Sequence, residues 1–205
     1  MPDTRQRILD ASLDLFSQSG YAAVSIRDIC ARVRVREGTI YYHFPNKRAI
    51  AEEILRAFAR AAQEKMAPLE AALQGMDCAP GEGFHRAACD AFLDSYFLDD
   101  FCNRVLRFLS MERFHSAEAR ALYDRWMFQE PLAFQERVFS RLLAFQAVSG
   151  ADGARLALRF YAPILLYAQR WLFSGALTQE SRERFRAEAG RHIAQFFGEI
   201  GGTRA

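Results

Sequence analysis

Residues 25–47 read SIRDICARVRVREGTIYYHFPNK. Ser25 is a favoured helix N-cap, and Asp28 follows three residues later, as in a capping box with Asp in place of Glu. The apolar spacing after Ser25 predicts a helix of about two turns, followed by a tight turn. Pro45 and Asn46 later stop one helix and cap the next. The stretch therefore predicts two short helices and the start of a third.

The second short helix is expected to run from near Arg36 to near His43. Ile40 and Phe44, four residues apart, are its predicted inward anchors. Polar and aromatic side chains occupy the rest of this helix, where a core helix would carry Leu or Ala. This pattern is typical of a helix-turn-helix whose second helix enters the major groove of DNA.

Composition allows a well-buried core in one or two domains. The chain has 205 residues, of which 51% are hydrophobic and 25% charged. Its net charge of +2 is uneven, because residues 1–50 hold eight Lys or Arg against five Asp or Glu. A mildly basic head on a nearly neutral body fits an anion-binding domain at the N-terminus.

The sequence shows no pattern typical of a metal-binding, disulfide-rich, secreted or membrane protein, or of an enzyme. The four cysteines and four histidines show no zinc or disulfide spacing, so we expect no metal, no cofactor and a cytoplasmic location. The N-terminus lacks a signal-peptide apolar region. The longest apolar run, residues 160–168, is far shorter than the roughly 20 residues that a membrane span needs. No nucleophile–base pair or phosphate loop suggests an enzyme.

Helical periodicity continues to the end of the chain, and no stretch shows strand alternation. We therefore predict an all-α protein of about nine helices, with a loop at 75–83. We expect Pro68 to kink or break the helix that begins at Lys47. A long helix should follow Ser116 to about Val148, with a kink at Pro131.

The N-terminal residues resemble the DNA-binding domain of the TetR/AcrR family of repressors. The resemblance rests on Ile8-Leu9, Ala11, Leu15-Phe16, Gly20-Tyr21, Ser25-Ile-Arg-Asp-Ile, Val35, Gly38-Thr39-Ile40-Tyr41, His43-Phe44 and Asn46-Lys47. It covers about the first 50 residues. It implies an N-terminal three-helix helix-turn-helix domain over 1–46 and a helical ligand-binding and dimerisation domain over 47–205. The implied function is a ligand-responsive repressor that binds an inverted repeat as a homodimer.

The predicted DNA contacts fall into two groups. Base contacts are expected from Arg27 and from the outward side of the second helix, while Gly38 lets its backbone approach the groove. Phosphate contacts are expected from the other polar and aromatic positions, although Tyr41 could be a core aromatic and His43 could cap its own helix. The full predicted set is Ser25, Arg27, Arg36, Glu37, Gly38, Thr39, Tyr41, Tyr42, His43 and Lys47.

Three positions depart from the family pattern. Family members usually have Gly at 34, Ser or a similar residue at 36, and Ala at 30, whereas this chain has Arg34, Arg36 and Cys30. Gly would suit a left-handed turn, so Arg34 either carries a conformational cost or imposes another turn shape. We expect the arginines around the turn to add phosphate contacts.

The region after residue 83 is rich in aromatic residues, which suits a core, a dimer surface and a pocket for a small, largely apolar effector. The predicted effector contacts are Tyr123, Trp126, Tyr161, Arg104 and Tyr167. The predicted dimer contacts are Leu165, Leu172, Ile193 and Phe197, although these could instead complete the core of the single chain. Two other functions stay open: an all-α small-molecule carrier, and a non-specific architectural DNA-binding protein.

Overall fold

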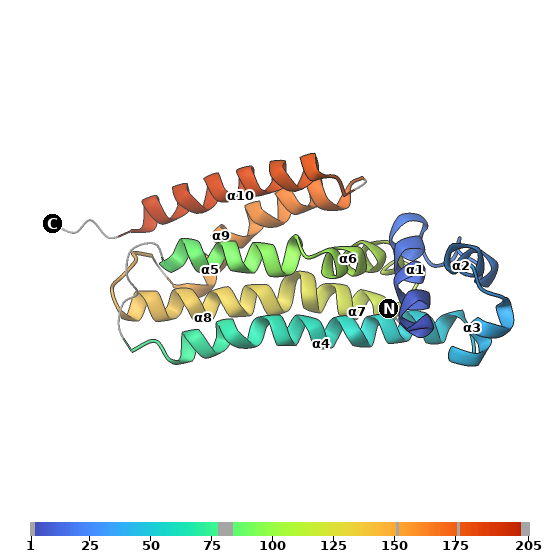
Figure 1. The fold of residues 1–205 in the computed structure, drawn as a ribbon. Coiled ribbons are helices and arrows are strands. Elements are labelled where there is room, and N and C mark those ends of the chain that lie inside the picture. Colours follow the sequence, from blue (N-terminus) through green and yellow to red (C-terminus); the bar gives the residue numbers. More distant parts are fainter. Residues whose placement is uncertain (1–2, 78–83, 151, 176, 202–205) are drawn as a thin grey trace. The chain divides into compact units, whose positions relative to one another are not determined.

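The computed structural model describes residues 3–77, 84–150, 152–175 and 177–201. The described residues are almost entirely helical, and their one β-type contact is an isolated bridge between Val148 and Gly201. The α-helices are α1 (Thr4–Ser19), α2 (Ile26–Val33), α3 (Glu37–His43), α4 (Lys47–Gln74), α5 (Phe84–Phe92), α6 (Asp100–Glu112), α7 (Ala117–Asp124), α8 (Glu130–Ala144), α9 (Gly153–Ala168) and α10 (Gln179–Ile200) (Figure 1).

Three π-helical segments extend these helices: η1 (Leu93–Phe97), η2 (Arg125–Gln129) and η3 (Gln169–Phe173). Segment η2 joins α7 to α8 without a break. Counted with the helices that they extend, the segments leave nine helical rods in the described part of the chain. The all-α prediction with about nine helices is therefore confirmed.

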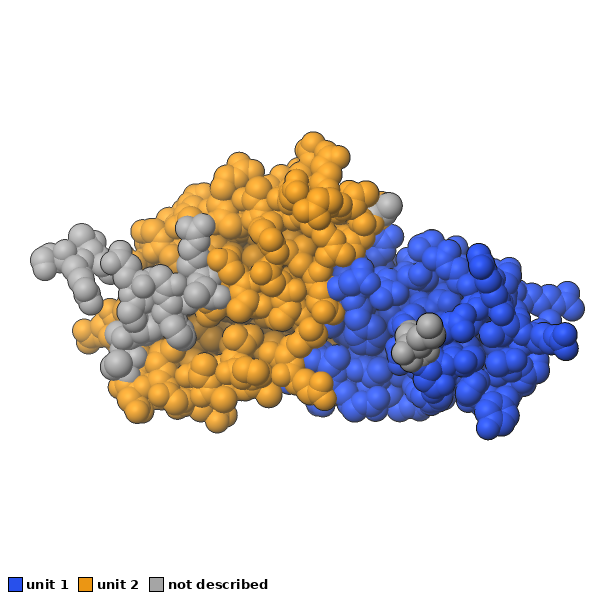
Figure 2. All heavy atoms as spheres, viewed as in Figure 1, with its two compact units in different colours: residues 1–63, 100–123 blue, residues 64–99, 124–205 orange. Residues whose placement is uncertain are grey.

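The chain divides into two compact units. Unit 1 comprises residues 1–63 and 100–123, and unit 2 comprises 64–99 and 124–205 (Figure 2). Helix α4 contributes its first part to unit 1 and its last turns to unit 2. This division by contacts does not test the functional boundary expected between residues 46 and 47, which stays a prediction.

Unit 1 is organised around α1. Its apolar stripe is buried, with Ile8 and Phe16 at 0% exposure, and it packs on α6, where the Phe16 and Phe108 ring centroids lie 5.3 Å apart. The first part of α4 adds Ile50 and Phe58, also fully buried. Gly20 ends α1 with φ at +78°, a conformation that Gly adopts without strain.

Unit 2 has an aromatic core. Phe97 lies at its centre, with ring centroids 5.7 Å from Phe185 and 6.4 Å from Tyr161. A second cluster joins α8, α9 and α10 through Phe139, Phe160 and Phe196. Most of the aromatic surplus seen in the sequence therefore fills the interior, as an apolar core requires.

Of the two outcomes predicted for Pro68, a break does not occur, because α4 continues to Gln74. One predicted helix end was wrong. The predicted long helix after Ser116 ends at Ala144 instead of near Val148, and a π-helical segment precedes Pro131. Pro131 directly follows η2, so its missing N–H falls where the continuous helix is already distorted. The predicted start of this helix after Ser116 is confirmed, and the Ser116 Oγ caps it by accepting from the Ala119 N–H at 3.2 Å.

Candidate nucleic-acid interface

The start of α2 is fixed by a reciprocal capping box. The Ser25 Oγ accepts from the Asp28 N–H at 3.2 Å, and the Ser25 N–H donates to Asp28 Oδ2 at 2.7 Å. The Ser25 hydroxyl also donates to the same carboxylate at 2.6 Å. These hydrogen bonds from Ser25 lower the pKa of Asp28. The Ser25 hydroxyl proton is thus already engaged within the protein.

The turn between α2 and α3 has the left-handed conformation that the family's usual Gly would favour. Arg34 adopts φ 62° and ψ 52°, and the Val35 N–H donates to the Cys30 carbonyl at 3.1 Å. Arg34 therefore bears the conformational cost that the sequence suggested, and the turn keeps its shape. Its side chain is exposed.

Helix α3 buries two anchors and exposes its other side. Ile40 is 0% and Phe44 2% exposed, as their spacing predicts. On the outer side, Tyr42 is 85% and Tyr41 50% exposed, an unusual exposure of aromatic area for a seven-residue helix. A side chain at Gly38 would meet no atom within 4 Å, so its backbone is open to an approaching partner.

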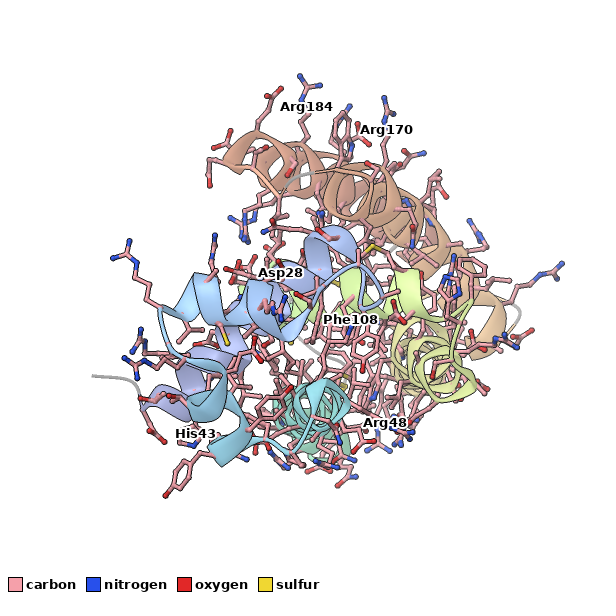
Figure 3. The ribbon with its side chains drawn as sticks, turned by 90° about the vertical axis from the view of Figure 1, so that its right-hand side faces the viewer. Asp28, His43, Arg48, Phe108, Arg170 and Arg184 are labelled. Atoms are coloured by element: carbon pink, nitrogen blue, oxygen red, sulfur yellow. The ribbon has the colours of Figure 1, made fainter. Side chains whose placement is uncertain are left out.

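The remaining predicted contacts lie around α3. Arg36 precedes the helix as its N-cap and is exposed, whereas Thr39 and His43 are half-buried. Figure 3 shows His43 at the end of α3 and Asp28 on α2. Helices α2 and α3 pack together, so their outer residues belong to one surface of unit 1.

Two predicted base readers pair with each other. Arg27 Nε, near the start of α2, lies 3.2 Å from Glu37 Oε1 at the start of α3. Their side chains are 88% and 46% exposed, so water screens the pair and its contribution to stability is small. Both groups remain available to a nucleic acid at little energetic cost.

Lys47 has a structural role that sequence reasoning missed. Its ammonium donates to the Tyr21 and Val24 carbonyls at 2.8 and 2.6 Å and lies 4.1 Å from the centre of the Tyr21 ring. It therefore holds the link between α1 and α2 against the start of α4. Nothing in the local sequence indicates these long-range carbonyl partners.

Helix α6 contacts α1 and the link that follows it, and so helps to hold α2 and α3 in place. Asp14 on α1 pairs with Arg32 of α2 at 3.1 Å and with Arg104 of α6 at 2.8 Å. Glu112, 9% exposed, accepts the Tyr21 N–H at 3.0 Å. Arg104, predicted as an effector contact, thus takes part in an ion-pair network in unit 1. Residues 90 positions apart gave no sequence signal of this pairing.

The other predicted effector contacts are dispersed. Tyr123 belongs to unit 1, where its ring lies 4.4 Å from the Arg113 guanidinium. Trp126 and Tyr161 are buried in unit 2, and Tyr167 is half-buried there. The Tyr161 hydroxyl donates to the Met127 carbonyl at 2.8 Å. None of the predicted effector contacts lines the apolar cavity found in unit 2, whereas Phe197, a predicted dimer contact, does.

That cavity has a volume of about 70 Å³ and lies among the end of α4, α5, α8 and one residue of α10. Phe92, Phe134 and Phe139 form much of its wall, and Cys89 and Gln135 are its polar residues. Spacing within single helices could not reveal it, since its walls come from four separate segments.

The four predicted dimer contacts differ in accessibility. Leu172 and Ile193 are 0% and 3% exposed within the single chain, so they already pack in its core. Leu165 and Phe197 are partly exposed. Among the described residues, no helix is long and apolar enough to cross a membrane, and no cluster of His, Cys, Asp and Glu could hold a metal ion.

A capped helix, a tight turn and a short helix with two buried anchors and an exposed outer side define a helix-turn-helix DNA-binding domain. Residues 8–54 match the family model described as "Bacterial regulatory proteins, tetR family". The chain thus carries the DNA-binding domain of TetR-family transcriptional regulators, and the resemblance predicted from the sequence is confirmed.

Known proteins agree with this assignment. The transcriptional regulator UidR of Escherichia coli K12 is 39% identical over 62 residues, which cover 28% of this chain and 32% of UidR. The match thus spans about a third of that relative. SmeT, the repressor of a multidrug efflux pump of Stenotrophomonas maltophilia, has a similar structure at 20% identity and a TM-score of 0.65, over 98% of this chain and 92% of SmeT. Its complex with triclosan gives a TM-score of 0.64 at 22% identity, over 98% and 93% of the two chains. These structures show that the fold extends over the whole chain.

Proposed function

We propose that this chain is a ligand-responsive transcriptional repressor, which binds an inverted-repeat operator as a homodimer and is released by a small, largely apolar effector. The observation that carries the proposal is the exposed outer side of α3 in a TetR-type domain. Two tyrosines that are 50% and 85% exposed on one short helix place aromatic and hydroxyl groups at the surface, where they suit contacts with DNA.

Within this proposal, the residues of the interface divide their work. Arg27, Glu37, Thr39 and Tyr42 contact bases, and Gly38 lets the backbone of α3 come close. In the free protein Glu37 holds Arg27, and DNA replaces that weak ion pair with contacts of its own. Phosphate contacts come from Arg36, Tyr41 and His43, and from Ser25 once its hydroxyl turns from Asp28 to the DNA. Lys47 contributes chiefly by fixing the start of α4.

The proposed homodimer uses the outer faces of α9 and α10. Leu158 and Leu166 are 58% and 64% exposed although they are large and apolar. On α10, Ala194 and Gly198 are exposed, and a side chain at Gly198 would meet nothing within 4 Å. Small residues on one helix and leucines on its neighbour suit close packing of two copies of this helix pair. Leu165 and Phe197 lie at its predicted edges.

The proposed effector binds in unit 2, where the described residues line an apolar cavity. SmeT, which has a similar fold, is known in a complex with triclosan. Helix α4 links the two units covalently, so a displacement of its last turns could pass along it to the DNA-binding domain. We place this function in the cytoplasm, where a bacterial regulator meets the chromosome.

Selection of bound DNA from a random duplex pool tests the proposal. We expect one inverted repeat to be enriched, bound at least about a thousandfold more tightly than random DNA. Tyr42→Ala should weaken this binding, whereas Phe114→Ala, which removes a 69% exposed aromatic outside the helix-turn-helix, should leave it unchanged. Tight binding without sequence preference would instead support an architectural protein, and failure to bind DNA would support a carrier.

A further inference from the structure

We propose that the effector is an uncharged, largely apolar molecule of about one aromatic ring, with a single hydrogen-bonding group that is received by Gln135 in the cavity of unit 2. This inference rests on the proposed function, because it specifies the chemistry of the effector. It assigns the specificity of the site to a residue that the sequence did not single out.

The first observation concerns Gln135 itself. Its side chain lines the cavity and is only 5% exposed, and it makes no hydrogen bond with another residue of the described chain. Its amide keeps a small accessible surface, so water can meet it in the free protein. A ligand that displaces this water must supply a hydrogen-bonding group of its own or leave the amide unpaired, which is unfavourable. A primary amide both donates and accepts, so a hydroxyl or a carbonyl group of the ligand satisfies it.

The second observation is the apolar character of the part of the cavity wall that the structure describes. Its described lining residues are uncharged, and most are aliphatic or aromatic, such as Leu73, Phe92 and Phe139. A carboxylate or ammonium group would lose its hydration there without gaining an opposite charge. The nearby Arg141 donates its Nε to the Met76 carbonyl at 3.2 Å, and its guanidinium lies 5.2 Å from the Phe145 ring, so it is engaged outside the wall.

The thiol of Cys89 in the cavity wall is a weak nucleophile. Burial raises the pKa of this thiol to about 12, so the nucleophilic thiolate is scarce at neutral pH. The cavity therefore selects by shape and by one hydrogen bond, without a covalent step. The same burial makes Cys89 a poor sensor of oxidants, although it lies beside the proposed ligand.

The size of the cavity links binding to movement. Its volume of about 70 Å³ is roughly half of the ~150 Å³ that holds a benzene molecule in an apolar protein cavity. A ring must therefore push the lining apart. Leu69 and Leu73 lie just beyond Pro68, which cannot donate a hydrogen bond to the preceding turn of α4. The last turns of α4 are thus the part of the wall that yields most easily.

Three matched probes test this chemistry with the full chain in the absence of DNA: 4-ethylphenol, ethylbenzene and 4-ethylbenzoate. Calorimetric titration should show that 4-ethylphenol binds about tenfold more tightly than ethylbenzene, the usual effect of one well-placed hydrogen bond in a buried site. The benzoate should bind most weakly. Gln135→Leu should abolish the preference for the phenol while ethylbenzene still binds.

Stability separates recognition from a structural role. Gln135→Leu should melt at the same temperature as the unmodified chain or above it, because it replaces an amide that bonds to no other described residue with an apolar side chain in an apolar wall. Gln63→Leu, a change of an exposed glutamine on α4, is the matched control and should leave all three affinities unchanged. A markedly lower melting temperature for Gln135→Leu would mean that the amide holds the fold, and would overturn the proposal.

The other outcomes are also decisive. Equal affinities for phenol and ethylbenzene, or tighter binding of the benzoate, would overturn the assigned chemistry. No binding of any probe would overturn the cavity as a site for such ligands. None of these results touches the selection of an inverted repeat from random DNA, so a failure here is distinguishable from a failure of the proposed function.

Discussion

Arg34 occupies a left-handed backbone conformation that glycine adopts far more easily. Arg34→Gly should therefore raise the free energy of unfolding by about 1 kcal/mol, less than the full left-handed penalty because glycine also loses more entropy on folding. Urea denaturation at a fixed protein concentration measures this change. If Arg34 contacts a phosphate, the same variant should lower the salt slope of DNA binding by about one.

Arg36→Gly is the matched control for this substitution. It removes the same charge two residues later, where φ is −80° and glycine relieves no strain. It should not stabilise the fold. Equal stability of the two variants would contradict the claim that conformational strain at Arg34 is appreciable.

Individual residues show what a sequence can reveal at this scale. The Ser25 cap and the Ile40 and Phe44 anchors depend on neighbours within four residues, and all were predictable. The carbonyl partners of Lys47 lie more than 20 residues away, and the Asp14–Arg104 pair spans 90. Such partners depend on the tertiary fold and leave no local pattern.

At the scale of elements, η2 shows how a distorted helix is held. Its successive carbonyls Trp126 and Met127 accept hydrogen bonds from the hydroxyls of Tyr96 and Tyr161. Tyr161→Phe should lower the free energy of unfolding by about 1 kcal/mol, because it leaves a buried carbonyl with one partner fewer. The change should not alter the affinity of the probes, since Tyr161 does not line the cavity.

Tyr167→Phe removes a hydroxyl from the same helix, α9, at a half-buried position without a hydrogen-bond partner in the described chain. Its unfolding midpoint in urea should match that of the unmodified chain. If both variants unfolded alike, the hydroxyl of Tyr161 would contribute nothing to the stability of η2. The prediction that Tyr161 contacts the effector would then be the remaining explanation for this hydroxyl.

Helices themselves were predictable, whereas their irregularities were not. Caps such as Ser25 and Asn46 are visible in the sequence and are present in the structure. The π-helical segments are not visible there, because the extra residue in each depends on how side chains pack around it. The sequence located aromatic residues in abundance, yet which of them face a cavity depends on the arrangement of four segments.

At the scale of the whole molecule, α6 belongs to a different unit from the one that the sequence suggested. The sequence predicted that the first 46 residues form a separate domain, but the contacts group residues 100–123 with them. Glu112 and Arg104 account for part of that grouping through Tyr21 and Asp14. A helix far along the chain thus helps to hold the proposed DNA-binding surface.

The pH dependence of global unfolding offers a test of burial in unit 2. Because the folded pKa of Cys89 is about 12 and that of an unfolded cysteine is about 8.5, the buried thiol contributes stability that is complete below about pH 8.5. As the pH rises further, the unfolded chain ionises first, and this stability is lost by roughly 1.4 kcal/mol per pH unit up to the folded pKa. Removing the thiol should remove this dependence.

Urea denaturation of the unmodified chain and of Cys89→Ala at pH 7, 8, 9 and 10 measures the effect. The difference in free energy of unfolding should be constant from pH 7 to 8 and should shrink, or change sign, from pH 9 to 10. Other groups that ionise in alkali act on both proteins and cancel in the difference. A constant offset across the whole range would show that the Cys89 thiol meets water, and that the cavity wall is open at this point.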